Sequence, residues 1–316
     1  MNQRIFTEKL NLIQRLPILQ DELQKSIEDY IFLLDHLPSS VIKYHHLSDA
    51  QIAFNKQYLN AFGNAALNDF HKLIMLELML RFPHRVVAHR LPESIYVLFA
   101  IEFERILVLI ESGSNFIFDW PNDLFAKDMG ICSLRLIPTG VRLLEVTGFS
   151  RKPLLNNWIR LIPNLYFLFF CVRAAKPLYE MHVHMSNLGD FNPAGWQQCL
   201  VRIGQLLRLN PEIKGLHGTS WFYDPALKGI SSHLAYLREI PCNHGAKVFF
   251  VQNDSANSEA FTKSKSRHVR FVNKEYTPKL FLLIWPRKEL INFSDQHQHL
   301  LSITSNLEKS TSNVPS

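Results

Sequence analysis

The four cysteines of this 316-residue chain lie far apart and include no CxxC pair: they are Cys132, Cys171, Cys199 and Cys242. A disulfide framework or a cysteine-based zinc site needs closer or denser spacing. A chain of this length buries a hydrophobic core without covalent staples. We therefore expect free thiols, most of them buried as small apolar groups.

Three signatures of cofactor binding or nucleophilic catalysis are also absent. No GxGxxG follows an expected strand and no GxxxxGK[ST] occurs, which disfavours dinucleotide and P-loop cofactors. The nucleophile elbow GxSxG is missing as well, because residues 218–222 read GTSWF and end in phenylalanine.

No apolar run reaches the roughly 20 residues that a bilayer core demands. The run 161–172 (LIPNLYFLFFCV) is shorter, and the run 91–110 contains three glutamates and an arginine. The first sixteen residues carry charge throughout, unlike the apolar run of a signal peptide. We expect a cytoplasmic protein, with peripheral contact at the inner membrane through a helix at 158–175 as an alternative.

The net charge of +6 and the pI of about 9.1 favour anionic partners. The one dense basic run, 263–270 (KSKSRHVR), lacks the interleaved aromatic residues of a nucleic-acid surface, so we do not expect nucleic acid as a partner. Arg267 in this run is a candidate for binding an anionic substrate group. A solvated basic face is the simpler alternative. The sequence indicates no oligomeric state.

The hydrophobic pattern changes character along the chain. Apolar residues recur every three or four positions through 1–113, which predicts a helical region, with breaks at Pro17 and Gly63. Short apolar segments alternate with helical ones through 114–295, and residues 296–316 form a polar tail. The fold class is therefore α/β (or α+β), with a helical N-terminal part packed on a mixed sheet.

Within the second region the pattern predicts strands and helices in alternation after a hairpin formed by 132–137 and 141–146. The predicted strands and helices are 178–185, 193–209, 213–222, 231–239, 247–252, 257–273 and 279–285, beginning and ending with a strand.

Two histidines offer the first candidate site. His182 and His184 stand two residues apart on a predicted strand, so their side chains share a face. Either could act as a general base. With a third ligand such as His217 they could also bind a metal, although we assign no metal ligand here. The simpler alternative is a pair of histidines hydrogen-bonded to backbone or water.

The stretch 215–225 (GLHGTSWFYDP) offers the second candidate site. Ser220 and Asp224 are candidate catalytic residues, and Trp221 and Tyr223 are candidate substrate-binding residues. The alternative is a strand that runs into an Asp-Pro turn, with Trp221 in the core.

Arg287 follows the last predicted strand in the motif WPR and is a further candidate for substrate binding. Because ligands gather at the carboxyl ends of strands in open α/β sheets, we expect one cleft lined by His184, Tyr223, Asp224 and Arg287.

Residues 182–287 resemble an uncharacterised bacterial family with SWFYDP in its middle and WPR near its end. The order of strand (181–183), helix, strand with Ser220 and Trp221, and then DPAL is similar to the C-terminal half of some GNAT-like acyltransferases, over about a third of the chain. The acyl-CoA loop of that family, Gln/Arg-x-x-Gly-x-Gly/Ala, is missing, since the nearest helix entry (187–192) reads NLGDFN.

The resemblance implies an acyltransferase-like enzyme that acts on an acyl thioester or a similar anionic small molecule, with acyl-CoA or an acyl carrier protein as donor. A histidine would act as general base and backbone N–H groups would hold the oxyanion. Two alternatives remain open: a histidine-dependent metalloenzyme, and a binding or peripheral membrane protein without enzymatic activity.

Overall fold

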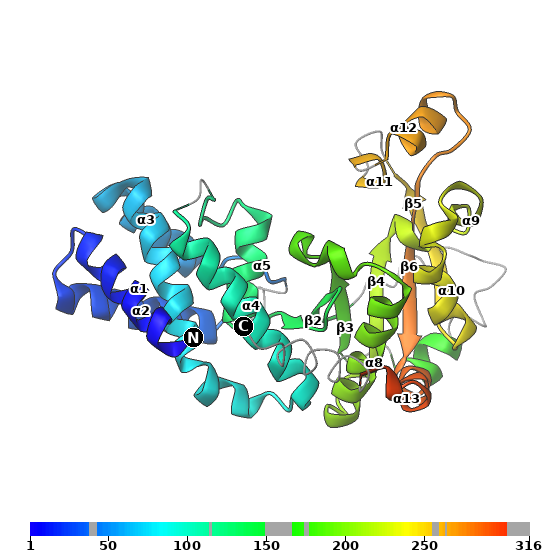
Figure 1. Cartoon of the computed structure of the whole chain (residues 1–316), viewed down its shortest axis with the longest axis horizontal. Coiled ribbons are helices and arrows are strands. Elements are labelled where there is room, and N and C mark those ends of the chain that lie inside the picture. The colour runs from blue at the N-terminus through cyan, green and yellow to red at the C-terminus, as the bar shows by residue number, and fades with distance from the viewer. Residues whose placement is uncertain are drawn as a thin grey trace, which may run out of the picture. The chain divides into compact units, whose positions relative to one another are not determined.

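The computed structural model describes residues 1–37, 43–113, 116–148, 166–173, 177–254, 259–262 and 264–301. It combines helices with a six-stranded mixed sheet, which confirms the predicted fold class (Figure 1). Its contacts form two compact units. The first contains residues 1–138, 143–145 and 184–186, and the second contains the other described residues. The division into 1–113 and 114–295 stays a prediction, and most of the predicted tail lies outside the described residues.

The first unit is built from helices: α1 (Asn2–Arg15), α2 (Gln20–Asp35), α3 (Asp49–Arg85), the short η1 (Val86–Ala88), α4 (Glu93–Glu111) and α5 (Asp123–Cys132). The chain breaks between α1 and α2 around Pro17, as predicted. Ser48 and Gln51 form a capping box at the start of α3, and Gly63 interrupts this helix with a φ of 84°. Helix α5 was not predicted, because its sequence lacks a long apolar periodicity.

The sheet has the strand order β1-β2-β3-β4-β6-β5. Its strands are β1 (Ile137–Pro138), β2 (Leu143–Thr147), β3 (Leu178–His182), β4 (Gly215–Ser220), β5 (Lys247–Asn253) and β6 (Lys279–Pro286). Strands β3 and β4 are parallel, whereas β1 and β2, β4 and β6, and β5 and β6 pair antiparallel. Helix α8 (Pro193–Leu209) joins β3 to β4, so the predicted adjacency of these strands is confirmed.

The remaining elements of the second unit are short: η3 (Phe167–Cys171), η4 (Met185–Asp190), η5 (Trp221–Tyr223), α9 (Leu227–Ile230), η6 (Ser232–Leu234), α10 (Tyr236–Asn243), α11 (Glu259–Thr262), α12 (Lys265–Val272) and α13 (Arg287–Gln296). The predicted helix 257–273 is divided into α11 and α12. Helix α13 was not predicted.

Different elements cover the two faces of the sheet. On one face, Trp285 of β6 contacts Phe293 of α13, and the Ser294 hydroxyl donates to the backbone carbonyl of Val201 in α8. Ile284, the neighbour of Trp285, points to the opposite face. There it joins an apolar cluster with Phe167, Val172, Leu178 and Leu282.

The prediction that the aromatic residues of 158–175 are buried is confirmed for Phe167 and wrong for two others. Phe167 is buried, but Phe169 is 61% exposed and Phe170 is 72% exposed. The predicted helix as a whole lies largely outside the described residues. Among the described helices, none has the length and apolar character needed to span a membrane.

Candidate functional site

A polar group lies on the sheet face that carries the apolar cluster. Along β3, Leu178, Glu180 and His182 point to the same side because side chains alternate in a strand. Leu178 is buried in the cluster, whereas Glu180 and His182 are half-buried. A carboxylate oxygen of Glu180 and a ring nitrogen of His182 lie within 4.8 Å of each other. An acid and an imidazole therefore lie close together at the carboxyl end of β3.

Thr147 joins this pair to a second imidazole. Glu180 lies opposite His217 in the parallel register of β3 and β4. The Thr147 hydroxyl donates to Oε2 of Glu180 over 3.1 Å, and its oxygen lies 3.1 Å from Nε2 of His217. Because Thr147 gives its proton to the carboxylate, its oxygen accepts the proton on Nε2 of His217. His217 and Thr147 are buried, with 3% and 5% of their surface exposed.

The resulting order is imidazole (His217), hydroxyl (Thr147), carboxylate (Glu180) and imidazole (His182). Thr147 holds the carboxylate of Glu180 in place beside His182. The imidazole of His182 is a group that can accept a proton from a bound nucleophile. His182 and His217 were predicted from the sequence, whereas Glu180 and Thr147 were not. The spacing of two residues between Glu180 and His182 was the available signal, whereas nothing local indicated Thr147.

His184 does not share a strand face with His182, so the predicted pair was wrong in its premise. Strand β3 ends at His182, and His184 is a buried residue of the first unit. Its Nε2 lies 3.2 Å from Oδ1 of Asp128, which also pairs with the Arg105 guanidinium. The backbone N–H of Ser186 donates to Nδ1 of His184 over 3.2 Å. This environment fits a residue that anchors the chain after β3.

The side-chain oxygens of Ser220 and Asp224 both accept hydrogen bonds from backbone N–H groups in the turn that follows β4. The Ser220 hydroxyl oxygen accepts from the N–H of Phe222 over 3.2 Å. Oδ1 of Asp224 accepts from the N–H of Ala226 over 2.9 Å, as in an Asx turn. The second oxygen, Oδ2, is buried without a hydrogen bond to any described residue. Burial, and then the negative charge of Asp224, raises the pKa of Tyr276.

Trp221 and Arg267 pack on each other, although both were predicted to bind substrate. Trp221 belongs to an apolar cluster with Leu227 and Ala260, and the Arg267 guanidinium lies 4.7 Å from the centre of its ring. Arg267 donates from Nε to the carbonyl of Ala260 over 2.6 Å and from Nη1 to the hydroxyl of Ser231 over 3.1 Å. Burial lowers the pKa of this guanidinium. These contacts tie α12 to the turn after β4.

Arg287 does not share a cleft with Tyr223 and Asp224. The antiparallel register pairs Pro286 with Gly215 at the start of β4, whereas Tyr223 follows the end of that strand. Arg287 donates from Nη1 to the carbonyl of Asn210 over 3.0 Å, directly after α8. The prediction failed because β6 runs antiparallel to β4. The hydrophobic pattern of a strand does not reveal its direction in the sheet.

A buried cation lies among the segments that follow β3 and β4. The Arg142 guanidinium, in a residue only 3% exposed, lies 5.1 Å from the ring of Phe191, 5.2 Å from Trp196 and 5.5 Å from Phe222. Nε and Nη2 of Arg142, and Nε1 of Trp196, hydrogen-bond to nothing in the described part of the chain. Tyr223 is buried near this charge: burial raises its pKa and Arg142 opposes the rise.

The arrangement of Arg142 differs from the usual state of a buried charge, which is paired or hydrogen-bonded. Trp196 stands in the first turn of α8, whose N-terminus is capped by Asn192. Helix N-termini attract anions. The unsatisfied donors are of the kind that bind an anionic group.

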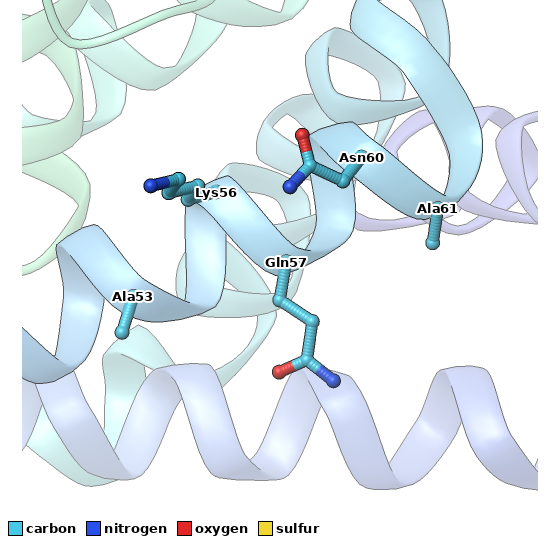
Figure 2. A pocket seen from close by; sticks show the side chains of 5 residues that line it. All are labelled: Ala53, Lys56, Gln57, Asn60 and Ala61. Carbon is cyan, nitrogen blue, oxygen red and sulfur yellow. The ribbon is translucent and has the colours of Figure 1, made fainter.

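A surface hollow on α3 offers no such chemistry. Figure 2 shows its lining side chains, which are Ala53, Lys56, Gln57, Asn60 and Ala61. The hollow is a broad, open depression with a volume of about 560 Å³. It holds neither an acid nor an imidazole, so it is not a candidate reaction site.

No protein-family model matches the chain, and no curated protein matches it. In structure it is similar to an acyltransferase in complex with decanoyl-CoA, with a TM-score of 0.51 and 13% identity, over 87% of this chain and 82% of that one. An acyltransferase mutant in complex with octanoyl-CoA has a TM-score of 0.43 and 13% identity, over 88% and 99%. An acyltransferase in complex with CoA and 10C-teicoplanin has a TM-score of 0.42 and 14% identity, over 71% and 68%. The first of these similarities shows a shared fold.

Proposed function

We propose that this chain is an acyltransferase that moves an acyl group from an acyl thioester to an acceptor amine or hydroxyl. The observation that carries the proposal is the pair of hydrogen bonds through which Thr147 joins Glu180, the neighbour of His182, to His217. The shared fold with an acyltransferase that was solved with decanoyl-CoA supports the choice of donor. The further likeness of the C-terminal half to GNAT-like enzymes stays a prediction.

In the proposed reaction, His182 takes the proton of the acceptor while the acceptor's nitrogen or oxygen attacks the thioester carbonyl. The carbon–sulfur bond then breaks, and the proton passes from His182 to the sulfur of the leaving thiol. Glu180 stabilises the imidazolium during this transfer, and Thr147 and His217 keep Glu180 in position. An imidazole suits this role because its pKa lies close to neutral pH.

The donor side of the proposal rests on Arg142. Its unsatisfied Nε and Nη2, together with Nε1 of Trp196, fit a phosphate of an acyl-CoA or of the phosphopantetheine arm of an acyl carrier protein. The missing GNAT loop does not contradict this assignment, because side chains rather than a glycine-rich backbone would supply the donors.

Thermal unfolding in the presence of decanoyl-CoA tests the donor. A ligand that binds only the folded protein stabilises it by about 2.7 kcal/mol at a hundred times its Kd, so the Tm rises measurably. We expect a rise with decanoyl-CoA that is reduced in Arg142→Lys and further reduced in Arg142→Gln. Arg208→Gln, which alters an exposed arginine paired with Asp295, is the matched control. An unchanged Tm in the wild type contradicts the proposed donor.

Metal-dependent catalysis is the second candidate, because Glu180 and His182 offer two ligand atoms close together. It predicts that thiol release from decanoyl-CoA is lost in EDTA and restored by Zn²⁺. Full activity in EDTA excludes it.

A further inference from the structure

Three aromatic side chains are largely exposed at η3: Tyr166, which precedes it, and Phe169 and Phe170 within it. Tyr166 and Phe169 are each 61% exposed, and Phe170 is 72% exposed. Phe169 and Phe170 belong to the π-helical turn 167–171, and Tyr166 directly precedes it. The rings of Tyr166 and Phe170 stack with their centres 5.2 Å apart. We call these three residues the aromatic ridge.

The opposite side of the same turn is anchored to the sheet. Phe167 and Val172 are buried against Leu178, Leu282 and Ile284. The turn is therefore apolar on both sides, and packing against the sheet buries only one of them. Burial of Phe167 and Val172 holds the aromatic ridge outward, instead of allowing it to turn into the core.

Cations flank the aromatic ridge. Arg173, three residues after Phe170, is exposed, and Nζ of the exposed Lys247 lies 4.5 Å from the ring centre of Phe167 in the same turn. The sequence carries the same bias further, because residues 146–179 contain five lysines and arginines and no aspartate or glutamate. Exposed aromatic rings next to cations fit the headgroup region of an anionic bilayer.

We propose that the aromatic ridge inserts into the surface of a bilayer that contains anionic lipids, with Arg173 and Lys247 against the headgroups. The turn is too short to span a bilayer, so the protein lies on the membrane. Three side chains are also a small surface for a stable protein partner, which needs about 800 Å² on each side. This proposal goes beyond the acyltransferase assignment and does not depend on it.

Sedimentation of the full chain with vesicles tests the proposal. We expect binding to phosphatidylcholine vesicles that contain phosphatidylglycerol, weak binding to phosphatidylcholine alone, and a decrease as salt screens the attraction. The double variant Phe169→Ser, Phe170→Ser should lower the partition coefficient by roughly tenfold or more, given the apolar area it removes. Phe32→Ser is the matched control, because Phe32 is 59% exposed on α2 in the first unit.

The other occupants of this surface are outcomes that overturn the proposal. Equal vesicle binding by the double variant and the wild type would show that the aromatic ridge is not the docking surface. Sedimentation velocity that shows a wild-type dimer, and a monomer for the double variant, would assign the surface to a second copy of the chain. Loss of decanoyl-CoA binding in the double variant, without any vesicle binding by the wild type, would assign it to the acyl chain of the substrate. None of these readouts requires turnover, so they stand whether or not acyl transfer is observed.

Discussion

Glu180 and His217 lie opposite each other on adjacent parallel strands, and the hydroxyl of Thr147 connects their side chains. Both contacts of the hydroxyl measure 3.1 Å, so one threonine serves an acid and an imidazole at once. Replacing Thr147 would remove both hydrogen bonds at once, and a hydrogen bond lost inside the protein costs more than an exposed one. The proposed catalytic roles of His182 and Glu180 depend on this relationship.

Thr147→Val should lower kcat and leave KM for decanoyl-CoA nearly unchanged. Valine keeps the shape of threonine but removes the hydroxyl, so Glu180 and His217 each lose their contact with Thr147. We also expect the free energy of unfolding to fall by about 1–3 kcal/mol. Thr147→Ser should restore both kcat and stability. A valine variant with wild-type kcat would show that Thr147 has no part in positioning Glu180.

Asp224→Asn should preserve the rate of thiol release from decanoyl-CoA. Asparagine keeps the side-chain oxygen that accepts from the N–H of Ala226, so the turn after β4 is retained. Ser220→Ala should likewise preserve the rate and cost about 1 kcal/mol of stability, because only a turn hydrogen bond is lost. A folded Asp224→Asn protein without activity would instead support the catalytic role that the sequence first suggested for this residue.

Arg267→Lys should destabilise the protein by about 1–3 kcal/mol without raising KM. Lysine cannot reproduce the hydrogen bond from Nε to Ala260 or the planar contact with Trp221. Urea unfolding and initial rates measure the two effects separately. A higher KM at unchanged stability would return Arg267 to the substrate-binding role predicted from its basic run.

His71 should make the stability of the protein depend on pH. It is fully buried, its Nδ1 donates to the carbonyl of Phe118 over 2.7 Å, and burial lowers its pKa from 6.5 to about 4. As the pH falls, His71 therefore takes up its proton at a higher pH in the unfolded chain than in the folded protein. The contribution of His71 is present above pH 6.5 and decreases by about 3 kcal/mol as pH falls to about 4.

Urea unfolding of the wild type and of His71→Gln across this range isolates the effect. The difference in free energy of unfolding between the two proteins should shrink by about 3 kcal/mol between pH 7 and pH 4. A difference that stays constant with pH would contradict the assigned pKa.

The local parts of this structure could be predicted, and the long-range parts could not. Helix α8 was predicted at its observed bounds because Pro193 suits a first helical turn and the apolar spacing ends at Leu209. The length of β3 was overestimated, since the apolar texture continues past His182 while the backbone leaves the sheet there. That error placed His184 beside His182, although its partner is Asp128, 56 positions earlier in the sequence.

The same difference between local and long-range contacts explains which residues of the candidate site could be predicted. Glu180 could have been found from its spacing with His182, because alternation along a strand is a local property. Thr147 is 33 positions from Glu180 and 70 from His217, and no local pattern encodes such a contact. Arg142 was missed for a similar reason, since three aromatic rings from distant segments surround it. The position of Arg287 depended on the direction of β6, which the hydrophobic pattern does not specify.

Thiol release from decanoyl-CoA by the wild type and by His182→Gln is the most direct test of the account. Glutamine keeps a polar side chain of similar length but cannot accept the proton, so the account predicts a kcat lower by roughly 10²- to 10⁴-fold. Ser220→Ala, measured beside it, should keep the wild-type rate. A His182→Gln protein that folds and releases thiol as fast as the wild type would contradict the central claim.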